Sequence, residues 1–98
     1  MELRDYIEQG AKKAGSVAAL ARTIGVVQQP MNEAKHHRRP LPLDAAIKLA
    51  DFIGEDRIDV ISANELATEK KPEKQDFWRG LLNAPKTGQL SYIRHMMN

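Results

Sequence analysis

The sequence predicts an all-α protein: one compact domain of four to five short helices, followed by a helical extension. Apolar residues recur at spacings of three and four, which is the period of one helix face. Glycines and capping residues stand at the boundaries between these periodic segments. No internal segment shows a reliable strand pattern. The alternative for the segment "QLSYIRHM" near the C-terminus is a short strand that pairs with its counterpart in a dimer.

The first two helices are defined by apolar faces and by what ends them. Residues 3–14 form the first helix, and Gly15 ends it. Ser16 is a good N-cap for a second helix of about eight residues, which Gly25 stops. Gly10 is an unusual residue for a helix interior. The apolar face of the first helix comprises Leu3, Tyr6, Ile7, Ala11 and Ala14.

A third helix is expected over residues 28–37. Pro30 fits its first turn, because an N–H group there has no intrahelical partner. The segment "RRPLPL" that follows is expected to be extended, since a proline disfavours helix in the residue before it.

Three more helices are expected, over residues 43–53, 58–70 and 73–83. Gly54 ends the fourth helix, and Pro72 breaks the chain before the sixth. The residues expected to face inward are Leu43, Ala46, Ile47 and Ala50 in the fourth helix and Ile58, Ile61, Leu66 and Ala67 in the fifth. We accordingly expect a helix-turn-helix domain of residues 1–57, a helical extension of residues 58–83 and a mobile tail of residues 84–98.

Composition excludes several classes of protein. The chain has 98 residues and no cysteine, which excludes disulfides, thiolate metal sites and cysteine catalysis and favours a reducing compartment. No apolar run approaches the roughly 20 residues of a membrane span. The charged start "MELRDYIEQG" has no signal-peptide apolar region. We therefore expect a cytoplasmic protein with no membrane partner.

Positive charge is concentrated in the N-terminal part. Residues 1–40 carry 7 Lys/Arg against 4 Asp/Glu, whereas residues 41–98 carry 8 against 9. Such asymmetry indicates a local anionic partner, with chance as the alternative explanation.

Residues 17–36 form the unit that matters most for function: a short helix, a turn built on Gly25 and a second helix. Ala21 is small, as required where two helices cross closely at a steep angle. Gly25 supplies a backbone conformation that a side chain would resist. The expected core of this unit is Leu20, Ala21, Ile24, Gly25, Val26, Met31 and Ala34.

This pattern resembles the helix-turn-helix of the phage Cro and cI-type repressor family. The resemblance is strongest over residues 16–54 and rests on "IGVVQQPMNEA" and on "RRPLPLDAAIKLADFIG", which is similar to the turn and fourth helix of Cro-like prophage regulators. The segment "DVISANELATEKKPEKQDFW" is similar to the C-terminal extension of small regulators from filamentous prophages. The resemblance implies a Cro/repressor-like fold in a bacterial or prophage-encoded, nucleoid-associated protein.

The resemblance also implies roles for single residues. The third helix would lie in the major groove of DNA as the recognition helix. The implied base contacts are Gln28, Gln29, Asn32 and Lys35. The implied phosphate contacts are Ser16, Arg22, His36, Arg38 and Arg39. Three residues depart from the family pattern: Pro30 in the recognition helix, Glu33, which phosphate would repel, and Val27 in place of a polar residue.

The expected function is therefore a sequence-specific, double-stranded DNA-binding regulator of transcription. It would act as a homodimer on palindromic half-sites. As a repressor it would occlude a promoter. As an activator or excision factor it would contact another regulatory protein or RNA polymerase, or bend DNA. The alternative is a protein-binding adaptor of the antitoxin or antirepressor kind, because a fold alone does not settle function.

No pattern indicates an enzyme, a cofactor or a metal. His36 and His37 are adjacent, so they point in different directions on a helix. The acidic residues Asp44, Asp51, Asp56 and Asp59 do not converge on a pocket. The aromatic segment of the sixth helix is either core or a dimer interface, whose candidate residues are Phe77, Trp78, Leu81 and Leu82.

Overall fold

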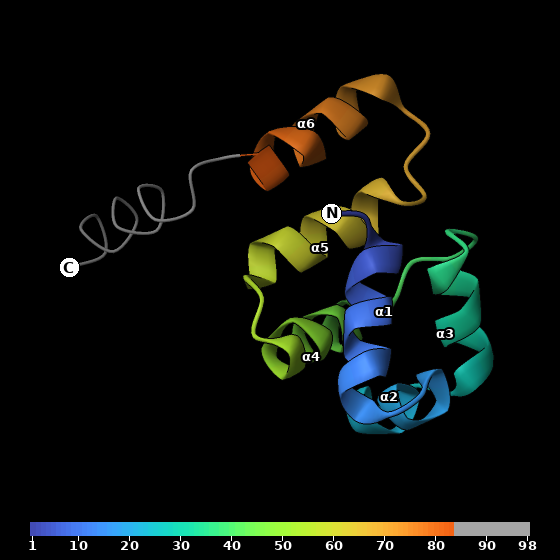
Figure 1. The fold of residues 1–98 in the computed structure, drawn as a ribbon. Helices are drawn as coiled ribbons and strands as arrows, with labels where there is room; N and C mark the ends of the chain where they lie inside the picture. The colour runs from blue at the N-terminus through green and yellow to red at the C-terminus, as the bar shows by residue number, and fades with distance from the viewer. Residues whose placement is uncertain (84–98) are drawn as a thin grey trace.

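The computed structural model describes residues 1–83, which form six α-helices and no strand (Figure 1). The helices are α1 (Leu3–Ala14), α2 (Val17–Ile24), α3 (Gln28–Lys35), α4 (Leu43–Ile53), α5 (Arg57–Leu66) and α6 (Pro72–Asn83). The prediction of an all-α protein is confirmed for these residues. The tail of residues 84–98, with its alternative strand, lies outside the described residues.

The helix boundaries follow from local chemistry. The Ser16 hydroxyl accepts a hydrogen bond from the Ala19 N–H at 3.0 Å, which makes Ser16 the N-cap of α2 as predicted. Gly25 ends α2 with φ of 78°, in the left-handed region that favours glycine. Both α1 and α4 span the predicted residues. Pro72 is the first residue of α6, where its missing N–H costs nothing.

Two helices are shorter than the sequence predicts. The prediction that the third helix reaches His37 is wrong, because α3 ends at Lys35 and His37 is left-handed with φ of 57°. The prediction that the fifth helix runs to Lys70 is also wrong, because α5 ends at Leu66. In the turn that follows, the Glu69 Oε1 atom accepts hydrogen bonds from the backbone N–H groups of Lys70 and Lys71, each at 3.1 Å. Such side-chain bonds compete with helix formation.

One core runs from α1 to α5. Its buried apolar residues are Leu3, Tyr6, Ile7, Leu20, Ala21, Ile24, Met31, Ala34, Leu41, Ala45, Ala46, Leu49, Ala50, Val60 and Ala63. Helix α1 lies at the centre and contacts α2, α3, α4 and α5 (Figure 1). Helix α6 contacts α5 and no other described helix. Within residues 1–83, no helix has the length and apolarity needed to cross a membrane.

Gly10 lies where α1 comes closest to its neighbours. A Cβ atom at Gly10 would stand 2.9 Å from methyl groups of both Leu20 and Leu49. Glycine inside this helix is therefore explained by the close approach of α2 and α4, which the sequence does not reveal.

The inward face of α5 differs from the prediction. The four residues predicted to face inward are only half-buried, whereas Val60, Ser62, Ala63 and Asn64 are buried. The prediction fails because α5 is packed between the main core on one side and α6 on the other, so its apolar residues serve two surfaces. Leu43 is likewise wrong as a core residue, since it is 59% exposed at the start of α4.

Candidate nucleic-acid interface

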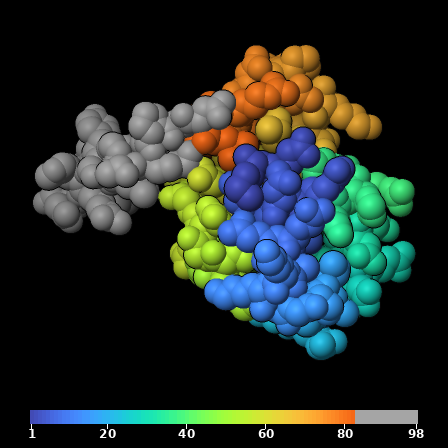
Figure 2. Space-filling model, in the orientation of Figure 1, coloured from blue at the N-terminus to red at the C-terminus, as the bar shows by residue number. Residues whose placement is uncertain are grey.

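Helix α3 lies at an edge of the molecule and is covered on one side only (Figures 1 and 2). It contacts α1 and α2, but none of the other described helices. Met31 and Ala34 are fully buried against these two helices and fix the orientation of α3. The opposite side of α3 is open to solvent.

The open side of α3 carries side-chain amides. Gln28, Gln29 and Asn32 are all exposed, and none of their side-chain amides is hydrogen-bonded to another described residue. Each amide has two N–H donors and a carbonyl acceptor. The three predicted base-contacting amides thus lie together on one helix face and are free to bind a polar ligand.

Lys35, the fourth predicted base contact, stands three positions after Asn32 and seven after Gln28, so it lies on the same side of α3 as these amides. It is half-buried, and its carbonyl accepts a hydrogen bond of 3.4 Å from the Arg4 Nε atom of α1. The bond from Arg4 involves only the Lys35 backbone, so it leaves the Lys35 ammonium group available to a ligand of the amide face.

The turn after α3 carries the predicted cations. His36, Arg38 and Arg39 are exposed. The Arg39 Nε atom lies 3.1 Å from a carboxylate oxygen of Glu33. Glu33 therefore offsets the charge of Arg39, so Arg38 is left as the less neutralised guanidinium of this turn.

The same turn is tied to the start of α1. The His37 Nε2 atom accepts a hydrogen bond from the Arg4 backbone N–H at 3.4 Å. This N–H belongs to the first turn of α1, which has no intrahelical partner for it. Together with the bond from Arg4 to the Lys35 carbonyl, it joins the end of α3 to α1. Sequence reasoning missed these roles of Arg4 and His37, because the two residues lie 33 positions apart and only the fold brings them together.

Helix α2 holds the remaining predicted contacts. Ser16 acts as the N-cap through its acceptor oxygen, and its hydroxyl hydrogen remains available for donation. Arg22 is exposed in the last turn of α2. Leu20, Ala21 and Ile24 are buried, whereas Val26, which follows Gly25, is half-buried.

Two further residues lie at the turn between α2 and α3. A Cβ atom at Gly25 would stand 3.6 Å from the Lys48 Nζ atom, so the ammonium group of α4 lies beside this turn. The Lys48 ammonium is also 4.0 Å from a carboxylate oxygen of Asp44. Val27, the N-cap of α3, is 69% exposed next to the amides. Sequence reasoning missed Lys48 because it lies 23 positions from Gly25, and only the fold brings them together.

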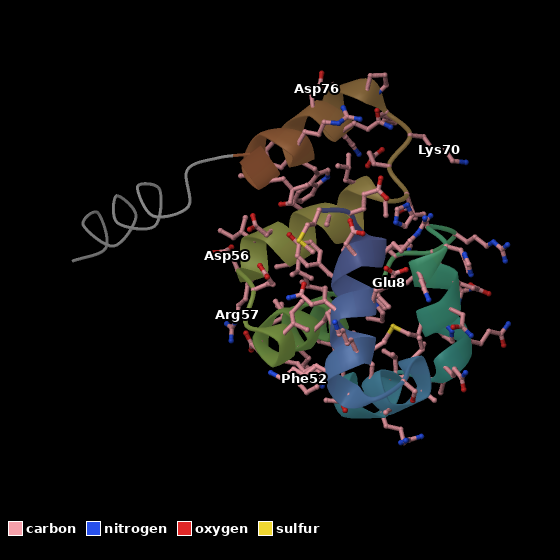
Figure 3. All side chains as sticks on the ribbon, in the orientation of Figure 1. Glu8, Phe52, Asp56, Arg57, Lys70 and Asp76 are labelled. Carbon is pink, nitrogen blue, oxygen red and sulfur yellow. The ribbon has the colours of Figure 1, made fainter. Side chains whose placement is uncertain are left out.

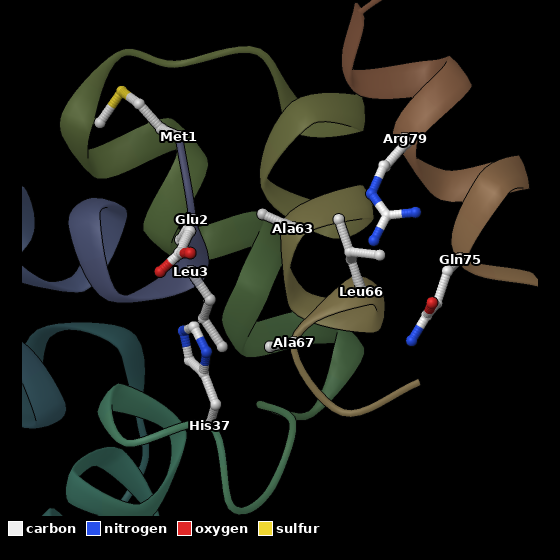
Figure 4. A pocket seen from close by; sticks show the side chains of 9 residues that line it. All are labelled: Met1, Glu2, Leu3, His37, Ala63, Leu66, Ala67, Gln75 and Arg79. Carbon is white, nitrogen blue, oxygen red and sulfur yellow. The ribbon is translucent and has the colours of Figure 1, made fainter. Parts of the chain in front are cut away.

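A pocket of about 280 Å³ lies where α5, α6, the N-terminus and His37 meet (Figure 4). Leu3 and Ala63 supply apolar walls, while Gln75 and Arg79 lie on the α6 side. Its other lining residues are Met1, Glu2, His37, Leu66 and Ala67. The pocket separates part of α6 from the turn that follows α3.

The aromatic pair of α6 divides between two environments. Phe77 is 60% exposed, whereas Trp78 is half-buried. The ring centroids are 5.0 Å apart with an interplanar angle of 78°, which is an edge-to-face contact. Leu81 and Leu82, the other candidate interface residues, are half-buried.

Two of the acidic residues, Asp51 and Asp56, stabilise the fold through hydrogen bonds. Asp56, labelled in Figure 3, caps α5 by accepting hydrogen bonds from the Ile58 and Asp59 N–H groups. The Asp51 carboxylate binds the Arg57 guanidinium through two hydrogen bonds of 2.8 Å, and this partner lowers the pKa of Asp51. Within residues 1–83, no three His, Asp or Glu side chains are placed to hold a metal ion.

Comparisons with protein-family models, curated proteins and solved structures gave no match.

Proposed function

We propose that the chain is a sequence-specific, double-stranded DNA-binding regulator of transcription of the Cro/cI helix-turn-helix kind. The observation that carries the proposal is the exposed amide face of α3, which two short helices and a glycine turn present at the edge of the molecule. Bacterial or prophage origin and a cytoplasmic, nucleoid-associated location belong to the same proposal.

The dimensions of α3 suit the major groove. An α-helix with its side chains is about 10–12 Å across, and the major groove of B-DNA is roughly as wide. Glutamine and asparagine amides bind adenine through its N6 and N7 atoms in bidentate fashion. Gln28 and Gln29 stand at the N-terminal end of α3, which is the end that approaches base edges in this class of protein.

The surrounding cations suit the phosphate backbone. Arg22, His36, Arg38 and Arg39 are exposed around α2 and the end of α3, and Ser16 stands at the N-terminus of α2. Such contacts set the position and affinity of a protein on DNA but not its sequence preference. Lys48 joins this group because its ammonium lies beside the α2–α3 turn.

The proposal is tested by selection from a randomised duplex pool, followed by fluorescence anisotropy on the selected duplex. We expect the protein to enrich a short motif repeated with two-fold symmetry. Arg38→Ala should weaken binding to selected and random duplexes alike and reduce the salt dependence by about one unit of log–log slope. Lys74→Ala removes an equal charge from exposed α6 and serves as the matched control. A pool with no enriched motif would reject the proposal.

The alternative is a protein-binding adaptor built on the same fold. Reversing the charges of Lys35, Arg38 and Arg39 separates the two functions. A DNA-binding regulator would lose most of its DNA affinity, because phosphate contacts supply the sequence-independent part of binding. An adaptor would still capture its protein partner after the same changes.

A further inference from the structure

Helix α6 exposes a ridge of residues on the side that faces away from α5. Gln75 and Trp78 are half-buried, whereas Glu73, Phe77 and Gly80 are exposed. The three exposed residues are spaced by four and three positions, so they lie above one another on one helix face. α6 makes its described helix contacts with α5 alone, and Figure 1 shows it at one end of the molecule.

The Phe77 side chain projects from this ridge in an orientation that Trp78 helps to fix. Its ring is 60% exposed, yet it makes an edge-to-face contact with Trp78 at a centroid distance of 5.0 Å. An aromatic ring held in one orientation loses little conformational entropy when a partner covers it. Aromatic residues, phenylalanine among them, are enriched in protein–protein interfaces.

Gly80 forms a notch one turn further along the same ridge. No described heavy atom lies within 4 Å of a Cβ atom built at Gly80. Gly10, by contrast, is required by the close approach of Leu20 and Leu49. Packing within the described chain therefore does not explain glycine at position 80. What Gly80 does offer is bare helix backbone beside Phe77, onto which a second helix can pack closely.

We propose that this ridge is a self-association surface, on which α6 of a second copy of the chain packs antiparallel. Each Phe77 ring would lie over Gly80 of the other copy. A two-fold interface must be complementary to itself, so the projecting and the receiving residue must both be present on one patch. The ridge meets this condition because Phe77 and Gly80 share one face of one helix.

The charges on the ridge select the antiparallel direction. A parallel pair would place Glu73 against Glu73, which is repulsive, whereas the charge of Asp76 is offset by the Arg79 guanidinium at 3.4 Å. An antiparallel pair that crosses between Phe77 and Gly80 separates the two Glu73 residues by about 16 Å along the axis. This inference is independent of DNA binding, since a chain that binds no DNA would still associate in this way.

Sedimentation equilibrium of the full chain, over a wide range of concentration and without DNA, tests the proposal. We expect a reversible monomer–dimer equilibrium. Phe77→Ala should weaken association at least about tenfold, because it removes the central aromatic contact twice per dimer. A wild-type chain that stays monomeric at every concentration would overturn the proposal.

Gly80→Leu separates loss of association from loss of folding. Leucine is a better helix former than glycine and meets no described atom at this position, so thermal stability of the monomer should not fall. The same leucine fills the notch, and association should again weaken at least about tenfold. Lys12→Leu, on exposed α1, is the matched control and should associate as the wild type does. Unchanged association of Gly80→Leu would contradict the proposed contact.

A mixture of the two variants tests the pairing itself. In a heterodimer of Phe77→Ala with Gly80→Leu, one contact remains Phe77 over Gly80, and in the other the new leucine lies over the new alanine. We therefore expect the equimolar mixture to dimerise more tightly than either variant alone. A mixture that associates no better than its components would overturn the antiparallel register.

Discussion

At the scale of single residues, the least foreseeable feature is Asn64. This asparagine is buried in α5, and its amide binds both polar groups of the Leu41 backbone, accepting from the N–H at 2.7 Å and donating to the C=O at 2.9 Å. Leu41 lies in the extended connection between α3 and α4, where no helix satisfies its backbone. Asn64 therefore anchors the end of the α3 turn to α5.

Replacing Asn64 by leucine should lower the free energy of unfolding by about 2–4 kcal/mol, because two buried backbone groups lose their partners. Asn32→Leu is the matched control. Asn32 is exposed, so its replacement should change stability by no more than about 0.5 kcal/mol. Urea unfolding of both variants measures the difference. Equal stability of the two variants would show that the hydrogen bonds between Asn64 and Leu41 do not stabilise the fold.

Replacement by alanine should lower the stability of the fold at Gly10 and raise it at Gly80. At Gly10 the added methyl group would stand 2.9 Å from buried leucine side chains, and overpacking of about 1–3 kcal/mol should outweigh a helix-propensity gain of about 1 kcal/mol. At Gly80 no described atom is close, so the propensity gain should dominate. Melting temperatures of the two variants check this, and a higher value for Gly10→Ala would refute the close-approach explanation.

At the scale of elements, the position of α3 separates residues that recognise bases from residues that bind phosphate. Gln28→Ala should relax specificity at one or two base pairs and cost about 1–3 kcal/mol on the preferred duplex, with little change on random DNA. Anisotropy on single-base variants of the selected duplex measures this effect. A loss that is the same for every sequence would count against base contact by Gln28.

Tyr6, which packs between α1 and the α4–α5 region, should make the free energy of unfolding depend on pH. Burial raises the pKa of Tyr6 from 10.0 to about 12, assisted by the negative charges of Asp59 and Glu55. In the unfolded chain the Tyr6 phenol loses its proton near pH 10. In the folded protein the phenol is still protonated at that pH and loses its proton only near pH 12. The contribution of Tyr6 to stability is therefore complete below pH 10 and is lost as pH rises from 10 to 12.

Urea unfolding across this pH range checks the prediction by comparison of the wild type with Tyr6→Phe. The variant should lose the part of the pH dependence that comes from the phenol, because phenylalanine has no proton to lose. Parallel curves for the two proteins would contradict the burial-induced shift.

The helices could be predicted from the sequence because their signals are local. Ser16, Gly25 and Pro72 mark boundaries through capping and backbone conformation, which neighbouring residues determine. The buried face of α5 could not be predicted, because it depends on packing against both the core and α6. The contact of Lys48 with the Gly25 turn is likewise set by the tertiary fold.

The same division holds for the candidate interface. The exposed amides of α3 follow from periodicity, since Met31 and Ala34 fix which side of α3 is buried. The pairing of Arg39 with Glu33 and the link from His37 to Arg4 arise only once the turn after α3 adopts its left-handed residue. DNA binding itself stays a prediction from residue chemistry and from the resemblance to Cro-like regulators.

At the scale of the whole molecule, the proposed DNA-binding and self-association surfaces lie on different helices. α3 and α6 make no direct contact with each other, and each packs on a different part of the α1–α5 core. A dimer joined through α6 would thus leave both α3 amide faces open. The two proposals can be tested separately, because variants of Phe77 and Gly80 leave α3 unchanged.

The most direct test of the central claim is fluorescence anisotropy of the full chain on its selected duplex, measured across a salt series with random DNA as competitor. The account predicts tight binding that survives the competitor and weakens with salt, and that falls selectively in Gln28→Ala. Binding that random DNA removes completely would contradict sequence-specific recognition by α3, and would leave only a generic basic surface.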